Sequence, residues 1–470
     1  MRAKIIFSLS LLIPFALVFI YVWTTATDLA YRDDMYLIKG GFIESYLKGT
    51  LTFADLWRPT IAARILGYNL LQIANIKWFS MNSRLIILLV PFLMLSSALL
   101  IYRDYRKSLA PDRSPEFIAA TFLVLTLLIF NVIQWEGLSF GYGFVFQSPM
   151  PFFIASFISL ELFLTTGARK YWPLAFIMPA LAVLVFGGTH SFAFAPALGS
   201  TFLCYLLTRR SHLTKNFWFR ALMISIFLSA MAFLYMYRIS YNDYFPGDSL
   251  FHHVDIVLAY PFEALQFLLA AFGASIVGVD AFFACAYFSF HTIVAVGLVV
   301  LFLYALALVL FFRSRMYERT YLPLFLIMQT IWYLGFMTMG RFVAYEIDYG
   351  MTSYGMASHY TCVSIYGLVA MAWIFIFILT RPVRLNALLK GTLYAGFVMI
   401  FAGLLLTAAV EWRIQPSRKA YFEQIRSIAM RVDTATPEEL SEFPELFRDS
   451  LRLLREHRLN IYRTAPADRE

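Results

Sequence analysis

Acidic residues that could accept a proton cluster in one short segment near the N-terminus. Asp28, Asp33 and Asp34 all lie within residues 28–36, and Arg32 stands beside the adjacent pair. A carboxylate can act as a general base, a second carboxylate tunes its pKa, and an arginine can hold a phosphate. The segment therefore predicts a site where a proton is removed next to a bound anion. The alternative is that these aspartates cap a helix or solvate a loop.

The aspartates compete for the role of base. Asp33 and Asp34 are adjacent, so their side chains diverge on any regular backbone and cannot both face one substrate atom. Asp28 comes four residues after the apolar run 5–24 and is equally explained as its terminus. In an extended loop, side chains alternate between two faces of the backbone, so Tyr36 and Asp34 would point to one face and Asp33 to the opposite face. Both members of the pair remain candidates, and we favour Asp33.

Other residues with chemical potential have simpler explanations. His252 and His253 with Asp255 could bind a metal, but adjacent histidines do not share one helical face, so no metal site is predicted. Glu161 lies inside an apolar run, where we expect a hydrogen bond between helices. The glycine pair before His190 predicts a turn, from which His190 could still face a cavity.

Several common catalytic signatures are missing from the sequence. It contains no Gly-rich phosphate loop, no HExxH and no GxSxG, so no motif in the sequence indicates a nucleotide-dependent or hydrolytic enzyme. Segment 239–289 carries five acids and no lysine or arginine. A divalent cation is compatible with that composition but is not indicated by any ligand pattern, and the cofactor is left unknown.

The composition shows which kind of protein must position these residues. Hydrophobic residues make up 60% of the 470 residues, charged residues only 14%, and mean hydropathy is +0.69. Soluble proteins average about 45–50% apolar and about 25% charged. The chain cannot cover its surface with polar groups, so we expect an all-α polytopic membrane protein with the lipid bilayer as its main partner. The net charge of +9 then reflects loop placement, and no nucleic-acid partner is expected.

Apolar runs long enough to cross a bilayer predict about eleven transmembrane helices. The apolar segment 256–276 is interpreted instead as a re-entrant or interfacial helix. The predicted spans are 5–24, 84–102, 115–135, 150–167, 172–188, 191–208, 220–238, 290–312, 320–339, 362–380 and 391–410.

The basic residues orient these spans. With the N-terminus inside, the short cytoplasmic loops and helix edges carry 18 Lys and Arg, whereas the short loops on the opposite side carry only Arg341. Lys and Arg are retained on the cytoplasmic side of membrane proteins. We therefore expect a multi-pass protein with its N-terminus cytoplasmic and its C-terminus extracytoplasmic; in a bacterium this membrane is the cytoplasmic (inner) membrane.

Polar sequence is concentrated on the outer side. We expect a transmembrane domain at 1–410 with two outer loops, 25–83 and 239–289, and an extracytoplasmic helical tail at 411–470. The first loop contains an amphipathic stretch from Trp57 to Trp78, which predicts helices lying in the membrane plane. In the tail, Thr436, Pro437 and Glu439 form a helix-start signature.

This arrangement resembles the GT-C glycosyltransferases, multi-pass enzymes that use polyprenyl-phosphate-linked sugars. The shared features are the long first outer loop, the acidic pair after the first helix and the in-plane helices behind it. The chain is also similar to uncharacterised bacterial members of that type. The residues that carry this likeness are Asp55-Leu56-Trp57 with Arg58 and Arg64, Gln134-Trp135-Glu136 with Phe146-Gln147, Gly340-Arg341, Tyr349-Gly350-Met351, and Ala357-Ser358-His359-Tyr360-Thr361. His359 stands where those proteins have an arginine.

The resemblance implies a reaction and roles for these residues. A loop aspartate, Asp33 or Asp34, would be the general base in transfer of a sugar from a polyprenyl-phosphate donor to a glycan, lipid or protein acceptor, as in polysaccharide biosynthesis. The lipid phosphate would be bound by residues drawn from Arg341, Arg58, Arg64, His359 and Tyr360. Acceptor or cavity residues would be Tyr36, Glu136, Gln147 and His190.

Three other functions stay open at this point. An O-antigen polymerase or ligase also uses polyprenyl-linked glycans, but such enzymes usually place a large loop late in the chain with paired arginines. A transporter or flippase of lipid-linked sugars needs polar residues within its spans, and here only Glu161 qualifies. A scaffold without enzymatic activity is the third alternative.

Overall fold

The computed structural model describes residues 1–60, 63–209, 214–237, 250–284, 289–343, 355–381, 387–439 and 445–464. Over this part of the chain the fold is helical, with an isolated bridge between Thr60 and Ala63 and no strand. The expectation of an all-α fold is confirmed for these residues.

Ten helices among the described residues are long and apolar enough to cross a membrane. Each coincides with a span predicted from the sequence. They are α1 (Arg2–Thr25), α5 (Ser83–Leu109), the span Pro115–Ser139 that begins with α6 (Pro115–Ile129), the span Gly143–Thr166 that ends with α9 (Pro149–Thr166), α11 (Ser191–Thr208), α12 (Lys215–Met236), α16 (Phe290–Arg313), α17 (Leu322–Arg341), α19 (Thr361–Leu379) and α20 (Ala387–Met430).

The remaining predicted span, 172–188, differs from the others. It consists of α10 (Trp172–Ala180) followed by the π-helical segment η4 (Leu181–Val185), 14 residues in all, and ends before the glycine pair Gly187-Gly188. At 1.5 Å per residue this element is roughly 20 Å long, shorter than the usual hydrocarbon thickness of about 30 Å.

Segment 256–276, interpreted above as re-entrant or interfacial, is a sharply bent pair. Helix α13 (Leu250–Ala259) and helix α14 (Pro261–Ala274) meet at a bend of 99°. The short helix α15 (Val279–Ala284) follows. The bend coincides with Tyr260-Pro261, because a proline disfavours helical geometry in the residue before it.

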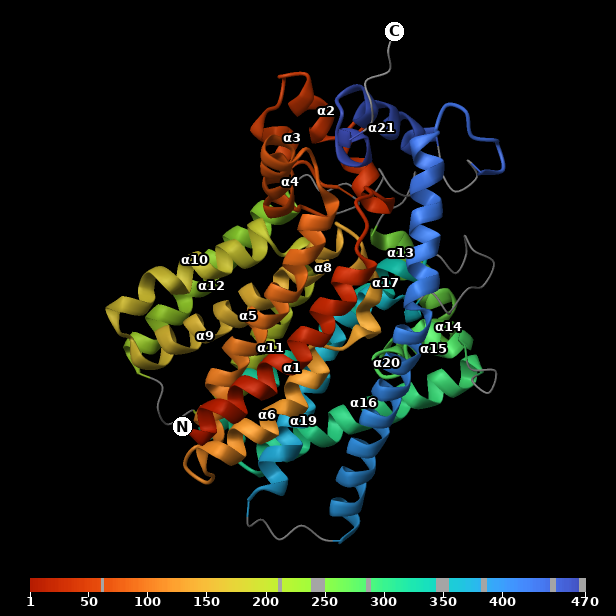
Figure 1. The fold of residues 1–470 in the computed structure, drawn as a ribbon. Coiled ribbons are helices and arrows are strands. Elements are labelled where there is room, and N and C mark those ends of the chain that lie inside the picture. Colours follow the sequence, from red (N-terminus) through yellow and green to blue (C-terminus); the bar gives the residue numbers. More distant parts are fainter. Residues whose placement is uncertain are drawn as a thin grey trace.

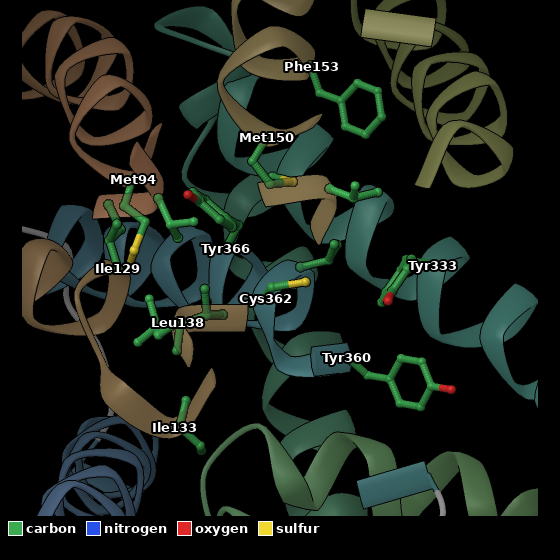
Figure 2. Packing of buried hydrophobic residues seen from close by; sticks show 14 of the residues in the cluster. Met94, Ile129, Ile133, Leu138, Met150, Phe153, Tyr333, Tyr360, Cys362 and Tyr366 are labelled. Atoms are coloured by element: carbon green, nitrogen blue, oxygen red, sulfur yellow. The ribbon is translucent and has the colours of Figure 1, made fainter. Parts of the chain in front are cut away.

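Helix α19 forms the centre of the bundle. All but the last of its residues are buried, and it contacts α6, α16 and α17 among others. A helix that is apolar on every side is stable only where neighbours surround it. In Figure 2, Tyr333 and Tyr360 lie on one side of the packing around Cys362, while Met94 and Ile129 lie on the other.

The first loop and the tail gather at one end of the bundle, which we call the loop end (Figure 1). The first loop carries η1 (Arg32–Leu37), α2 (Phe42–Leu47), α3 (Phe53–Trp57) and α4 (Leu66–Phe79), and the tail carries α21 (Glu445–Glu456) and η11 (Asn460–Thr464). Helix α20 continues across residue 410 without a break, so the tail begins inside a helix.

Asn460 is one of the residues that hold the tail against the first loop. The Asn460 amide donates to the carbonyl of Met81 at 2.8 Å and to the Ser83 hydroxyl at 2.9 Å, and its oxygen accepts from the Ala30 amide at 2.9 Å. Asn460 adopts φ +56°, a left-handed conformation that asparagine tolerates better than most residues. These bonds hold the tail against the segment that bears the aspartates.

Candidate functional site

Asp33 and Asp34 lie on η1, a single 3-10 helix. Side chains three residues apart eclipse in such a helix, so Asp33 shares a face with Tyr36 and Asp34 shares one with Leu37. The first face lines a cavity, whereas Asp34 is 1% exposed. The expectation that Tyr36 and Asp34 would lie on the same face was wrong, because the segment is a 3-10 helix and not extended.

Asp34 anchors η1 to helix α4. The Tyr68 hydroxyl donates to Asp34 Oδ1 at 2.5 Å, and the Gln72 amide donates to the Tyr68 hydroxyl at 2.7 Å. A Cβ at Gly141 would approach Asp34 Oδ2 to 2.9 Å, so a larger residue there would displace the carboxylate. Burial raises the pKa of Asp34 to about 7, against the opposing effect of the Tyr68 hydrogen bond. The side chain therefore has a structural partner and no access to the cavity.

The cavity beside Asp33 has a volume of about 720 Å³. Its walls come from η1, the segment 136–146, the ends of α11, α12 and α17, η9 (Ser358–Tyr360) and the tail. Most of the lining is aromatic or methionine, and the charged groups lie among these side chains. The aromatic lining residues are Tyr31, Tyr36, Phe140, Tyr142, Phe146, Phe192, Tyr333, Phe336, Tyr360 and Phe447, and the charged ones and the histidines are Arg32, Asp33, Glu136, His253, Arg341 and His359.

Glu136 organises the charged wall. One of its oxygens accepts from Arg32 Nη1 at 2.9 Å. The other accepts from the Ser358 hydroxyl at 2.9 Å and from the backbone amide of His359 at 3.2 Å, and lies 2.9 Å from His359 Nδ1. The His359 ring also stacks on Phe146, with centroids 5.1 Å apart. Glu136 thus fixes a guanidinium and an imidazole that approach the cavity from distant parts of the sequence.

Asp33 faces this wall. Burial raises the pKa of its carboxyl group, while the charges of His359, Arg341 and Arg32 act in the opposite direction. Arg341 is the last residue of α17 and lines the same cavity. The structure therefore brings together a partly buried carboxylate that can accept a proton and cationic groups that can bind an anion. From the sequence-predicted set, Asp33, Tyr36, Glu136, Arg341, His359 and Tyr360 all line this cavity.

The two arginines predicted from the first loop lie elsewhere. Arg64 is 3% exposed, and its guanidinium donates to the carbonyls of Trp57, Tyr235 and Tyr237 and stacks on the Trp57 ring. These contacts tie the first loop to the end of α12. Arg58 is exposed and lines a separate pocket next to Asp55.

Gln147 and His190 lie behind the cavity wall. The Gln147 amide donates to Gln134 at 2.5 Å, and Gln147 is 1% exposed. His190, also 1% exposed, stacks on Tyr333 with centroids 4.9 Å apart. Neither residue lines the cavity, but the His190 ring packs against the lining residue Tyr333.

Asp28 has a structural role as well. Its carboxylate accepts from the Ser83 amide at 2.9 Å and pairs with Arg463 at 2.8 Å, next to Asn460. Burial raises its pKa while Arg463 lowers it. Asp28 thus links the first loop to the tail, at a distance from the cavity lining.

Some cavity residues had no signal in the sequence. Tyr142, Tyr333 and Phe447 are single aromatic residues in an aromatic-rich chain, and no spacing sets them apart. His253 was considered only as a metal ligand, and it lines the cavity. Within the described ranges, no group of three His, Cys, Asp or Glu side chains is placed to hold a metal ion. The Tyr349-Gly350-Met351 motif lies outside the described residues.

The cavity can therefore bind an amphipathic anion against aromatic walls and remove a proton beside it. Asp33, Glu136, Arg341 and His359 come from four separate elements, η1, α7 (Trp135–Ser139), α17 and η9. No protein-family model, curated protein or solved structure matches this chain.

Proposed function

We propose that this protein is a membrane glycosyltransferase of the GT-C type, which moves a sugar from a polyprenyl-phosphate donor to an extracytoplasmic acceptor. The observation that carries the proposal is the shared cavity: Asp33, the cations Arg32 and Arg341, and the imidazole of His359 line one space with aromatic walls. A general base, a phosphate-binding group and a surface for a sugar ring are the three parts that such a reaction needs.

The donor fits the polarity of the cavity. Its phosphate would lie against Arg341 and Arg32, because guanidinium groups pair with phosphate oxygens in a bidentate geometry. The sugar would stack on the aromatic lining, and the polyprenyl chain would leave past Phe192, Met236 and Phe336, an apolar part of the lining where three long helices end. Met236 and Phe336 are also solvent-exposed in the structure.

The proposed reaction is a direct displacement at the anomeric carbon. The acceptor hydroxyl oxygen forms a bond to that carbon, the bond from the carbon to the phosphate oxygen breaks, and the hydroxyl proton passes to Asp33. The lipid phosphate leaves with the additional negative charge, which Arg341 and Arg32 stabilise. Burial raises the pKa of Asp33, which makes it a stronger base than a solvated aspartate.

The side of the membrane follows from the distribution of basic residues. The cavity lies at the loop end, together with the first loop and the tail. The other end carries the basic loops, and Lys and Arg accumulate on the cytoplasmic side. The cavity therefore opens toward the extracytoplasmic side in this proposal, where polyprenyl-linked sugars are used.

The test is sugar transfer by the purified protein in lipid nanodiscs. Radiolabelled undecaprenyl-phosphate monosaccharides serve as donors, and membranes from cells that lack the protein supply the acceptor. We expect protein-dependent transfer of label to a membrane component with one donor of the panel. Failure to bind undecaprenyl phosphate, together with absence of transfer from any donor, would refute the proposal.

A further inference from the structure

A second pocket lies next to the cavity at the loop end. It has a volume of about 360 Å³ and is formed by η1, α2, α3 and the first residues of α21. Its polar lining includes Lys39, Ser45, Asp55, Arg58 and Thr60. Like the cavity, this pocket contains groups of both charges, but its aromatic lining is limited to Tyr36 and Phe42, and Ser45 and Thr60 add aliphatic hydroxyls.

The pocket and the cavity meet at an aromatic pair. Tyr36 lines both spaces, while the consecutive tail residues Leu446 and Phe447 line the pocket and the cavity respectively. The rings of Tyr36 and Phe447 are nearly perpendicular, with centroids 5.6 Å apart. The two rings therefore form the partition, with one supplied by the first loop and the other by the tail.

The proposed base stands directly behind this partition. Asp33 precedes Tyr36 by three residues on η1, so the two side chains lie on one face, about 6 Å apart along the helix axis at roughly 2 Å per residue. A group that passes the Tyr36 ring from the pocket therefore enters the cavity on the face of η1 that carries Asp33. Among the aspartates of the first loop, Asp28 and Asp34 are held by other partners.

We propose that this second pocket binds the acceptor, and that the acceptor is a saccharide whose reacting hydroxyl passes the Tyr36–Phe447 pair to reach Asp33. This inference rests on the proposed glycosyltransferase function and adds the acceptor class and its binding site. Hydroxyl groups both donate and accept hydrogen bonds, which suits a pocket that offers Arg58 and Lys39 as donors and Asp55 as an acceptor.

The experiment fills the pocket and measures each substrate separately. Ser45 lines the pocket, and Ser45→Trp inserts an indole there. The matched control is Ala54→Trp, because Ala54 is exposed on α3 and does not line the pocket. Transfer is measured against acceptor membranes at fixed donor, and undecaprenyl-phosphate binding is measured by native mass spectrometry. Melting temperatures establish that both variants are folded.

We expect Ser45→Trp to raise the half-saturating amount of acceptor by about tenfold or more, which corresponds to about 1.4 kcal/mol of lost binding. Binding of undecaprenyl phosphate should be unchanged, and Ala54→Trp should behave as the unmutated protein. Arg58→Ala removes an exposed side chain without filling space, and it should also raise the half-saturating acceptor amount. This second variant tests the pocket even if the tryptophan disturbs folding.

Separate outcomes overturn separate claims. Normal acceptor dependence in both Ser45→Trp and Arg58→Ala would refute the pocket while leaving the glycosyltransferase proposal intact. Equal losses of donor binding and acceptor use in those variants would refute the separation into two spaces. A labelled product that proteinase K degrades would identify a protein acceptor and overturn the saccharide assignment. An unmutated protein that neither binds the lipid phosphate nor transfers sugar would overturn both proposals.

Discussion

Two substitutions of Glu136 distinguish the contribution of its hydrogen bonds to stability from the contribution of its negative charge. The carboxylate bridges two chain segments, since Oε1 accepts from Arg32 while Oε2 accepts from Ser358 and the His359 amide and lies 2.9 Å from His359 Nδ1. In Glu136→Gln, the amide oxygen can take the position of Oε2 and keep the contacts to Ser358 and His359. The amide nitrogen then faces Arg32, which loses its acceptor. Glu136→Ala removes all of these contacts.

The two substitutions should differ in their effect on stability. The Arg32 side chain is 53% exposed and can turn to water, so losing its pairing costs about 0–1 kcal/mol. Losing the buried carboxylate leaves the Ser358 and His359 donors without their acceptor, and breaking a buried charged pair typically costs about 3–5 kcal/mol. An unfolding entropy of about 2.1 cal/mol/K per residue gives about 1 kcal/mol/K for this chain. Glu136→Ala should therefore lower the melting temperature by about 3–5 °C, and Glu136→Gln by about 1 °C or less.

The measurement is thermal unfolding of the purified variants in one detergent, followed by intrinsic tryptophan fluorescence. A Glu136→Gln protein that melts as low as Glu136→Ala would show that the negative charge, and not the hydrogen bonds of Oε2, holds η9 in place. An alanine variant as stable as the unmutated protein would refute the bridging role altogether.

Three further predictions concern pH, anion binding and the tail. Asp34 has a pKa of about 7 in the folded protein and near 3.8 in the unfolded chain, so the free energy of unfolding should fall as pH rises from about 4 to about 7. Asp34→Asn should flatten the dependence of melting temperature on pH. An unchanged slope would contradict the assignment. Arg341→Ala should weaken undecaprenyl-phosphate binding by about ten- to a hundredfold, because a charge-assisted hydrogen bond contributes about 1.5–3 kcal/mol. Arg426→Ala is the control, because Arg426 lies outside the cavity lining and its loss should not weaken binding. Equal effects of the two substitutions would show a general effect of charge. Asn460→Ala and Asn460→Gly both remove the side-chain hydrogen bonds, but alanine in addition strains the backbone at φ +56°. The tail of the alanine variant should therefore be digested by limited proteolysis at a lower temperature than the tail of the glycine variant. Identical digestion of both would refute the backbone contribution.

The long helices could be predicted from the sequence because, in a chain of this composition, apolar runs of that length form few structures other than membrane-spanning helices. The start of the tail at residue 411 was harder to place. Polar residues begin at Glu411, but polarity indicates where a helix leaves an apolar environment and not where it ends. Helix α20 continues past Glu411 to Met430, and Arg418 in this continuation pairs with Glu411 and with Asp280 of α15.

The site could be predicted only in part. The acidic pair of the first loop was found from its residue types, but the face that each aspartate presents depends on the 3-10 conformation of η1, which single-residue spacing does not reveal. The bridge from Glu136 to His359 joins residues 223 positions apart and depends on packing. The family resemblance made Arg64 a candidate for phosphate binding, whereas its guanidinium donates hydrogen bonds to backbone carbonyls in the structure.

The most direct test of the account compares sugar transfer by Asp33→Asn and Asp34→Asn proteins at saturating donor, with undecaprenyl-phosphate binding and melting temperature measured in parallel. An amide keeps the shape of the side chain and removes the base, and general-base assistance typically contributes about 10²–10⁴-fold. The account predicts that Asp33→Asn loses at least about a hundredfold in transfer rate with donor binding intact, while Asp34→Asn, buried against Tyr68, retains most of its rate. Near-normal transfer by the Asp33→Asn protein would contradict the central claim.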